Sequence, residues 1–371
     1  MDGWHFPRTD LANHYLSLFD LGISSSFALI APRRKGKTLF ILRDLAPAAN
    51  KKKYLPVYAS LWSNINAPHE GLIQALEEAI AAQDKKGFVS RLLQAKIKKA
   101  TLSNELLGRM EVEFAGNPEK VSSKELTYLD QLLTTLTEKA GKKTVLLLID
   151  EVQHLSTSPA FDPLTHALRT MLDKRQGQVK SMFTGSSRHY MNLLFNESQS
   201  PFYHFSQPLP FPDLDRDFLT FLQEKLASDH HLTVSVAELS RSFSQLDQSP
   251  YWMMKLITRL VTARTSCKEA LEYVTHLIEA AEDYEGLAKQ MKPADRLIFL
   301  ALCDGKNPFS QTLLQRIDQQ TSVKGVASNI QRSLQRLQEQ QLISQPKKGE
   351  YQVEKSGLER FLRTREKPKS K

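Results

Sequence analysis

The chain has 371 residues, of which 41% are hydrophobic and 25% are charged, and its net charge is +9, values that predict a globular protein of two or three domains. Its two cysteines, Cys267 and Cys303, are far apart, which argues against a disulfide framework or a cysteine metal site and favours a reducing, cytoplasmic location. No apolar run approaches the roughly 18 residues of a membrane-spanning helix, and residues 1–5 lack the features of a signal peptide, so we expect no membrane association.

The first predicted elements are a helix, a strand and a second helix. Residues 10–19 are amphipathic and predict a helix, which Thr9 or Asp10 can cap. An apolar run at residues 26–30 predicts a buried strand that ends in a tight turn, and residues 39–49 have a helical pattern. A strand, a glycine-containing loop and a helix in this order are typical of a nucleoside-triphosphate site.

The loop ends in Gly36, Lys37 and Thr38, as in the phosphate-loop pattern G-x-x-x-x-G-K-[ST]. Backbone N–H groups and the positive end of the helix can hold phosphate oxygens, the Lys37 ammonium can contact the β- and γ-phosphates, and the Thr38 hydroxyl can bind Mg²⁺. The pattern has glycine at position 31, where this chain has Ala31, which would resist a left-handed backbone. The predicted ATP-binding residues of this loop are Ala31, Pro32, Arg33, Arg34, Lys35, Gly36, Lys37, Thr38 and Leu39.

A second apolar run, at residues 145–149, ends in two acids. Five large apolar residues bounded by polar ones predict a central parallel strand that is buried on both faces. Ligands of such sheets bind at the carboxyl ends of the strands, where Asp150 and Glu151 would lie. We expect Asp150 to hold Mg²⁺, directly or through water, and Glu151 to polarise the attacking water. The alternative is an ordinary strand followed by a solvated acidic turn.

The remaining patterns before residue 212 complete an α/β domain. Predicted strands lie at residues 55–61, at residues 179–186 and within residues 200–212, and predicted helices lie at residues 69–84, 123–139 and 161–175. Residues 85–125 have no clear pattern. Their basic run at residues 96–99 favours a solvated face, and a surface for a partner or DNA is the alternative.

Two further regions follow. Helical patterns at residues 214–228, 235–246, 250–264 and 267–285 predict an all-helical lid, with Pro250 at the first position of its third helix. From residue 292 onward there are 16 Lys and Arg against 8 Asp and Glu, so this last fifth of the chain carries +8 of the net charge, as expected of a module that faces a polyanion.

This basic region predicts a winged helix. Its elements are helices at residues 294–302, 313–319 and 322–341 and hairpin strands at residues 342–344 and 351–353. The third helix has an inner stripe of Val326, Ile330, Leu334 and Leu337. The predicted DNA-binding residues on its other side and at the hairpin tip are Lys324, Asn329, Arg332, Arg336, Lys347 and Lys348. The alternative is that this domain binds protein or packs on its own ATPase core.

Four motifs together resemble P-loop ATPases of the AAA+ and STAND superfamily, and most closely the archaeal-type, origin-recognition-like branch. Residues 32–38 are similar to its phosphate loop and residues 150–155 to its acidic strand end. Residues 184–187 resemble its third signature and residues 248–251 its lid motif. The resemblance spans residues 6–265. It implies a P-loop parallel sheet flanked by helices, then an all-helical lid and a C-terminal winged helix.

The resemblance also implies roles for single residues. It places the strand at residues 179–186 between the other two strands of the site, with Thr184, Ser186 or Arg188 as a polar sensor beside the γ-phosphate. The Arg188 guanidinium can stabilise the transferring phosphoryl, and the alternative is an exposed arginine at a helix start. The resemblance places Arg8 and Pro250 near the adenine.

The end of the helix at residues 161–175 carries Arg169 and Arg175, which a neighbouring subunit's site could receive. The second-sensor arginine of AAA+ proteins has no clear equivalent, which favours a slow, regulatory ATPase over a fast motor.

We therefore predict four domains: an ATPase core (residues 1–212), a helical lid (213–290), a winged helix-turn-helix (291–363) and a basic disordered tail (364–371). The predicted catalytic residues are Glu151, Lys37, Ser186 and Arg188. The predicted function is an ATPase with ATP and Mg²⁺ as cofactors that couples nucleotide state to association with duplex DNA. One alternative is an ATP-controlled switch that assembles with itself or a partner protein, and another is a nucleotide-binding scaffold with little turnover.

Overall fold

The computed structural model describes residues 2–83, 118–347 and 349–366. The chain forms two compact units, Met1–Phe221 and Leu222–Lys371, and the boundary falls inside one helix. The basic run at residues 96–99, the hairpin-tip residue Lys348 and the tail from residue 367 lie outside the described residues. None of the helices among the described residues is long and apolar enough to cross a membrane.

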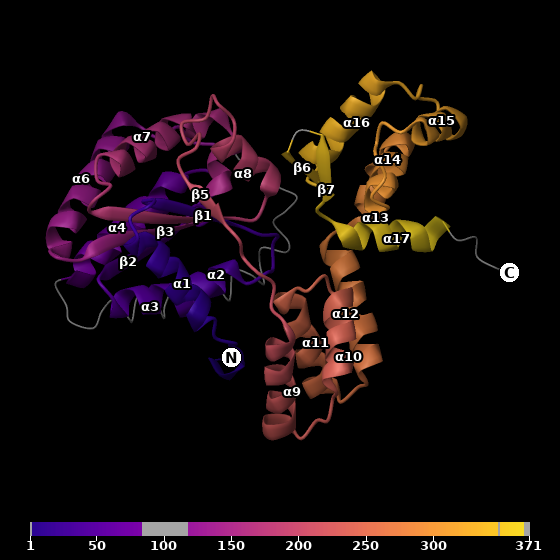
Figure 1. Ribbon diagram of the computed structural model, residues 1–371, viewed down its shortest axis with the longest axis horizontal. Coiled ribbons are helices and arrows are strands. Elements are labelled where there is room, and N and C mark those ends of the chain that lie inside the picture. Colours follow the sequence, from indigo (N-terminus) through magenta and orange to yellow (C-terminus); the bar gives the residue numbers. More distant parts are fainter. Residues whose placement is uncertain (1, 84–117, 348, 367–371) are drawn as a thin grey trace. The chain divides into compact units, whose positions relative to one another are not determined.

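The first unit is built on a parallel sheet of five strands in the order β2-β3-β4-β1-β5 (Figure 1). The strands are β1 (Ser26–Ile30), β2 (Tyr54–Ser60), β3 (Thr144–Asp150), β4 (Val179–Gly185) and β5 (Gln207–Leu209). The strand pairs that join them are all parallel. β4 lies between β1 and β3, as the resemblance implied. The carboxyl ends of β1, β3 and β4 therefore meet at one edge of the sheet.

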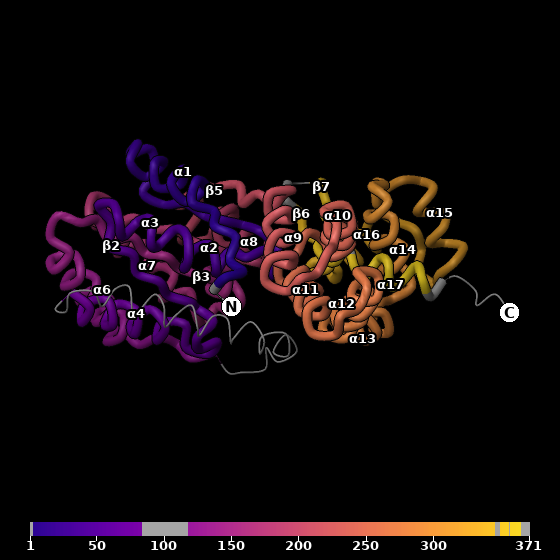
Figure 2. The backbone as a smooth tube through the Cα atoms, turned by 90° about the horizontal axis from the view of Figure 1, so that it is seen from below, coloured from indigo at the N-terminus to yellow at the C-terminus, as the bar shows by residue number. Residues whose placement is uncertain are grey.

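Helices cover both faces of this sheet (Figures 1 and 2). They are η1 (Asp2–Trp4), α1 (Thr9–Asp20), α2 (Lys37–Phe40), η2 (Ile41–Leu45), α3 (Ala46–Lys51), α4 (Pro68–Gln83), α6 (Ser123–Ala140), η4 (Val152–Ser156), η5 (Pro159–Phe161), α7 (Asp162–Asp173) and α8 (Arg188–Phe195). α2, η2 and α3 follow one another without a break, and η2 is a π-helical turn just before Pro47. Proline has no N–H to give to the preceding turn, which explains a widened turn there.

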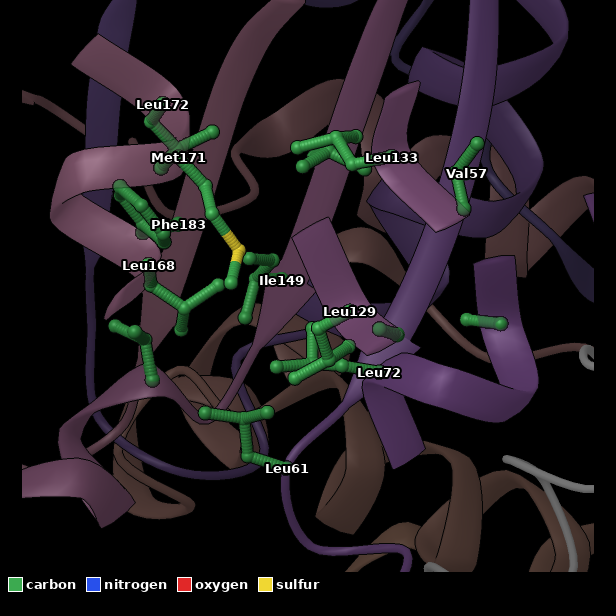
Figure 3. Packing of buried hydrophobic residues seen from close by; sticks show 14 of the residues in the cluster. Val57, Leu61, Leu72, Leu129, Leu133, Ile149, Leu168, Met171, Leu172 and Phe183 are labelled. Carbon is green, nitrogen blue, oxygen red and sulfur yellow. The ribbon is translucent and has the colours of Figure 1, made fainter. Parts of the chain in front are cut away.

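The alternation of side chains along β3 separates two hydrophobic clusters. Val145, Leu147 and Ile149 belong to the cluster under α4, α6 and α7, and Figure 3 shows Ile149 close to Leu168 and Met171 of α7. Leu146 and Leu148 belong to the cluster with α1, α2 and α3. Successive residues of a strand point to opposite faces, so Asp150, two residues after Leu148, points to the face of the phosphate-loop helix.

The described residues of the second unit form helices and one hairpin. Its first helices are α9 (Arg216–His230), which crosses the boundary, α10 (Val236–Gln245), α11 (Pro250–Ala263), α12 (Cys267–Ala281) and α13 (Tyr284–Gln290). Capping boxes begin α10 and α12, where Ser235 and Ser266 each exchange hydrogen bonds with a glutamate three residues later. These helices agree with the helical patterns that the sequence predicted for this region.

The winged helix follows as α14 (Pro293–Cys303), α15 (Gln311–Gln320), α16 (Ala327–Glu339), β6 (Ile343–Lys347) and β7 (Glu350–Val353). The strands form an antiparallel hairpin. A last helix, α17 (Ser356–Glu366), was not predicted, and its Leu358 and Leu362 are buried in the core of this region.

The structure corrects two expectations about α16. Val326 was expected on the inner stripe, but α16 starts at Ala327 and Val326, just before it, is 46% exposed. Arg336 was expected to point away from the core. Its guanidinium instead donates to both carboxylate oxygens of the buried Asp295 on α14, at 2.6 and 2.9 Å. A buried acid on the neighbouring helix therefore turns this arginine inward.

We predict that Arg336→Ala destabilises the second unit. The substitution leaves the buried Asp295 carboxylate without its cation, and the expected loss is about 3 kcal/mol. Amide hydrogen exchange of α14 and α16 measures this loss locally, because a chain of two units need not unfold in one step. Arg332→Ala, exposed on the same helix, is the control and should cost less than about 0.5 kcal/mol. Equal protection in both variants would contradict the prediction.

Candidate functional site

The loop between β1 and α2 turns sharply at two residues with left-handed backbone, Arg34 (φ 65°) and Gly36 (φ 90°). Gly36 immediately precedes α2, whose first N–H groups have no partner within the helix and so face the loop. Ala31 is not left-handed. It is buried, and its N–H donates to the Gly185 carbonyl of β4 at 3.4 Å. The methyl group at position 31 therefore causes no backbone strain.

Lys37 is buried at the centre of this loop. Its ammonium donates to the backbone carbonyls of Ala31 at 2.5 Å and of Pro32 at 2.9 Å. Burial lowers the pKa of Lys37, and the negative charges of Glu151 and Asp150 oppose this shift. Leu39, the last residue predicted for this loop, lies in α2.

Asp150, the last residue of β3, accepts hydrogen bonds from three hydroxyl groups. Thr38 and Tyr58 donate to Oδ2 at 2.7 and 3.0 Å, and Thr184 donates to Oδ1. Burial, and next the charge of Glu151, raise the pKa of Asp150, whereas the hydrogen bonds from the two threonines lower it. The structure thus brings the predicted Thr38 and Asp150 together and adds Tyr58, which the sequence did not indicate.

Glu151 follows with a left-handed backbone (φ 58°), which costs a residue other than glycine of order 1 kcal/mol. The Ser186 hydroxyl donates to Glu151 Oε2 at 2.7 Å. The amide of Gln153 in η4 donates to the same oxygen and, at 3.2 Å, to Ser186 Oγ. The predicted Glu151 and Ser186 are therefore in contact, and Gln153, which was not predicted, bridges them.

The other predicted loop residues contact the rim of the site. Arg33 Nε donates to Ser186 Oγ at 3.5 Å, and its guanidinium lies 4.7 Å from the ring centroid of Trp62. Lys35 forms an ion pair with Asp213 at 2.8 Å. Arg188 is the first residue of α8, and its positive charge contributes to the lowered pKa of Lys37.

Arg8 and Pro250 belong to different units. The Arg8 guanidinium donates to the Pro212 carbonyl at 2.6 Å and lies 4.5 Å from the ring centroid of Phe211. Arg8 therefore ties the N-terminal segment to the chain that follows β5. Pro250 begins α11 in the second unit, and its contact with an adenine stays a prediction.

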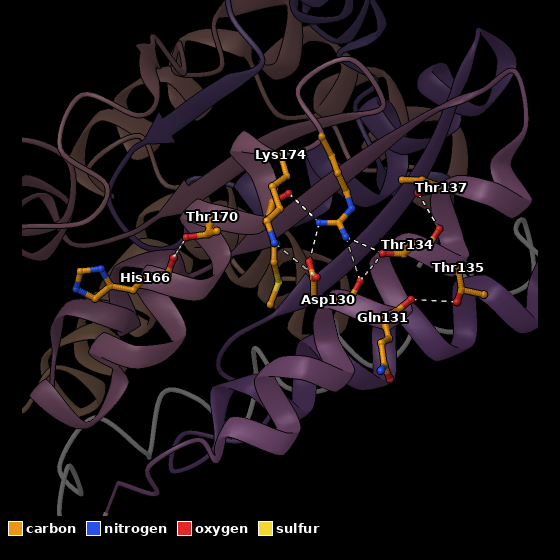
Figure 4. Close-up of polar contacts among 10 residues, drawn as sticks. Asp130, Gln131, Thr134, Thr135, Thr137, His166, Thr170 and Lys174 are labelled. Carbon is orange, nitrogen blue, oxygen red and sulfur yellow. Dashed lines mark hydrogen bonds and ion pairs between the residues drawn. The ribbon is translucent and has the colours of Figure 1, made fainter.

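The two arginines considered for a neighbouring subunit have partners inside the first unit. Arg175 bonds to the Asp130 carboxylate and to Thr134 Oγ1, both at 2.7 Å, and Figure 4 shows these two residues of α6. Arg169 pairs with Asp173 at 2.5 Å and lies over the Phe205 ring. The Arg169–Asp173 pair lies within α7, whereas the contacts with Phe205 and with α6 join α7 and the residues just after it to neighbouring segments.

The predicted DNA-facing residues whose side chains the structure describes divide into two groups. Lys324 and Arg332 are exposed. Asn329 donates to the Lys324 carbonyl at 2.9 Å and so shapes the turn before α16, while Arg336 is bound to Asp295. Of Lys347 only the backbone, in β6, is described.

The residues of the first unit fit a magnesium nucleotide. Carboxylate and hydroxyl oxygens are the ligands that Mg²⁺ prefers, and Asp150 and Thr38 supply one of each. In the described part of the chain no group of three or more His, Cys, Asp or Glu could hold a metal ion. Mg²⁺ would therefore depend on phosphate oxygens and water for its other ligands, which is its usual manner in phosphate sites.

No protein-family model and no curated protein matches the sequence, but solved structures match the fold. The Walker-type ATPase Paby2304 of Pyrococcus abyssi matches with a TM-score of 0.63 and 17% identity, over 97% of this chain and 99% of that chain. The Aeropyrum pernix ORC2 protein in its ADP form matches with a TM-score of 0.52 and 15% identity, over 96% of this chain and 91% of that chain. This chain has the fold of a Walker-type ATPase. The similarity to both structures covers nearly the whole chain, its C-terminal winged helix included.

We predict that Ala31→Gly leaves nucleotide affinity unchanged within about twofold, because the backbone at position 31 does not need glycine. The substitution should lower the stability of the first unit by about 0.5–1 kcal/mol, since glycine makes the unfolded chain more flexible. Equilibrium binding of a fluorescent ATP analogue and hydrogen exchange of β1 measure the two effects. A large gain in affinity would show that the alanine constrains the loop.

Proposed function

We propose that this chain binds ATP with Mg²⁺ in the first unit and hydrolyses it slowly. The observation that supports this most is the 2.7 Å hydrogen bond from Thr38, at the end of the phosphate loop, to Asp150, 112 residues later. It puts a hydroxyl, a carboxylate and the buried Lys37 at one edge of a parallel sheet. The names of the two similar structures, a Walker-type ATPase and a protein in an ADP form, support the same proposal.

Each residue then has a defined task. An ammonium has three N–H donors, and two of those of Lys37 bond to loop carbonyls, which leaves one for a phosphate oxygen. Thr38 and Asp150 hold Mg²⁺, which neutralises phosphate charge when it is bound. Glu151 orients the attacking water and takes up its proton. Ser186 and Gln153 fix the direction of the Glu151 carboxylate, because both donate to its Oε2.

The cations around the site stabilise the charge that develops on the transferring phosphoryl. Arg188 at the start of α8 and Arg33 in the loop are the arginines that we assign to this stabilisation. Turnover in this proposal is slow and regulatory, because no clear second-sensor arginine was found in the sequence.

We predict that two substitutions separate ATP binding from ATP hydrolysis. Lys37→Ala should abolish ATP binding, because it removes the buried cation. Glu151→Gln should retain ATP affinity and lose about 100-fold or more in hydrolysis, because a water-orienting base acts in the transition state. Fluorescent-nucleotide binding and phosphate release distinguish the two. Glu138→Gln, exposed on α6, is the control for loss of an acid. Hydrolysis by Glu151→Gln at the wild-type rate would contradict the assignment.

We further propose that the winged helix binds duplex DNA and that nucleotide state changes this affinity. The exposed face of α16 carries Gln331, Arg332 and Gln335, side chains that can hydrogen bond to base edges. The charge of +8 from residue 292 onward supports attraction to phosphates. Because Arg336 is engaged with Asp295, Arg332 and Lys324 are the exposed cations for DNA among the predicted residues whose side chains the structure describes.

We predict that DNA affinity falls steeply with salt. If about five phosphates are neutralised, affinity should fall about 500-fold between 50 and 200 mM salt. Arg332→Ala should weaken binding and reduce the salt slope by about 1 if it contacts a phosphate, whereas Arg241→Ala, exposed on α10, should not. ATP should change the affinity of the wild type and not that of Lys37→Ala. Binding that is insensitive to salt would favour a protein partner instead.

A further inference from the structure

Strand β2 carries two tyrosines, Tyr54 and Tyr58, which lie four residues apart and therefore point to the same face of the sheet. Both rings belong to the hydrophobic cluster that α1, α2 and α3 cover. Each hydroxyl donates to a carboxylate: Tyr54 to Asp20 at 2.6 Å and Tyr58 to Asp150 at 3.0 Å. The two tyrosines have the same chemistry, but only Tyr58 reaches the candidate site.

The strand register explains this reach. β2 and β3 are parallel, with Tyr58 opposite Leu148 and Ser60 opposite Asp150. Asp150 is thus the diagonal neighbour of Tyr58, two residues further along the adjacent strand, and a long aromatic side chain spans that distance. The tyrosine hydroxyl approaches the carboxylate from the β2 side, whereas Thr184 on β4 approaches it from the opposite side.

The carboxylate of Asp150 is consequently held at both oxygens. Thr38 and Tyr58 share Oδ2, and Thr184 bonds to Oδ1. The terminal torsion of an aspartate has a broad minimum, so bonds on both oxygens are needed to fix the carboxylate plane. Of the two hydroxyls on Oδ2, Thr38 is itself a proposed metal ligand. Tyr58 is the donor on this oxygen that does not bind the metal itself.

We propose that Tyr58 is a positioning residue for magnesium, whose hydroxyl fixes the Asp150 carboxylate in the orientation that binds the ion together with Thr38. This inference rests on the proposed ATP-binding function. Groups that orient a metal ligand typically change metal affinity 10- to 100-fold when they are removed. The Tyr58 hydroxyl bonds to Asp150, a proposed metal ligand. Removing this hydroxyl should therefore weaken the binding of Mg²⁺ and leave the affinity for metal-free nucleotide unchanged.

Tyr58→Phe tests this proposal, because it keeps the buried ring and removes only the hydroxyl. The full-length protein is titrated with a fluorescent ATP analogue in EDTA, and then with Mg²⁺ at a fixed concentration of the analogue. We expect unchanged affinity in EDTA and a rise of about 10-fold in the Mg²⁺ concentration at half-saturation. In phosphate release, added Mg²⁺ should restore most of the lost rate.

Tyr54→Phe is the matched control, since it removes a tyrosine–carboxylate bond from the same strand, to the exposed Asp20. Only Tyr58→Phe should shift the Mg²⁺ requirement. Equal Mg²⁺ half-saturation in the two variants would overturn the positioning role. A loss of affinity in EDTA would also overturn it, because it would mark a purely structural defect. A wild type that binds no nucleotide in either condition would instead overturn the proposed function, and this inference with it.

Discussion

The hydrogen bond between Thr38 and Asp150 depends on the whole sheet. β1 and β3 do not pair with each other, because β4 lies between them, yet their carboxyl ends meet at one edge since all three strands are parallel. The alternation along β3 turns Asp150 toward the helix that carries Thr38. A buried carboxylate is costly unless hydrogen bonds satisfy it, and three hydroxyl groups from three different segments do so here. The packing of the sheet therefore determines which hydroxyl groups surround Asp150, and so determines the chemistry of the site.

Adjacent acids have different surroundings because the backbone changes direction between them. Asp150 ends a regular strand, whereas Glu151 is left-handed and leads into the short helix η4. As a result Asp150 is enclosed by hydroxyls, while Glu151 bonds to Ser186 and Gln153. Backbone strain of this kind persists where surrounding contacts hold the residue in place. Here the hydrogen bonds from Ser186 and Gln153 and the buried helix η4 hold Glu151.

Much of this fold was predictable, because buried parallel strands appear in the sequence as continuous apolar runs and amphipathic helices as regular stripes. The strand that ends in Asp150 was found in this way, and the loop around Lys37 was found from its Gly-Lys-Thr pattern between a predicted strand and a predicted helix. Tyr58 was not found, since a tyrosine within an apolar strand resembles any core residue until the register of β2 on β3 is known. Arg336 was misjudged because a helical stripe assigns it to the outer side, and only the position of α14 reveals the buried acid. The concern that Ala31 would resist a left-handed backbone was also misplaced, because the backbone at this position is not left-handed. A sequence pattern alone does not specify the φ angle that a loop residue adopts.

The ion pair between Lys35 and Asp213 has a consequence beyond the stability of the loop. Asp213 follows β5 on the way to α9, and Arg8 anchors the preceding residue, Pro212, through its carbonyl. The chain that departs from the sheet is thus fastened to the loop that would receive a triphosphate. Lys35 carries a single charge, so an anion placed in the loop would compete with Asp213 for it. Binding of an anion in the loop would then weaken the ion pair between Lys35 and Asp213. The segment that follows β5 would in this way respond to what is bound after β1.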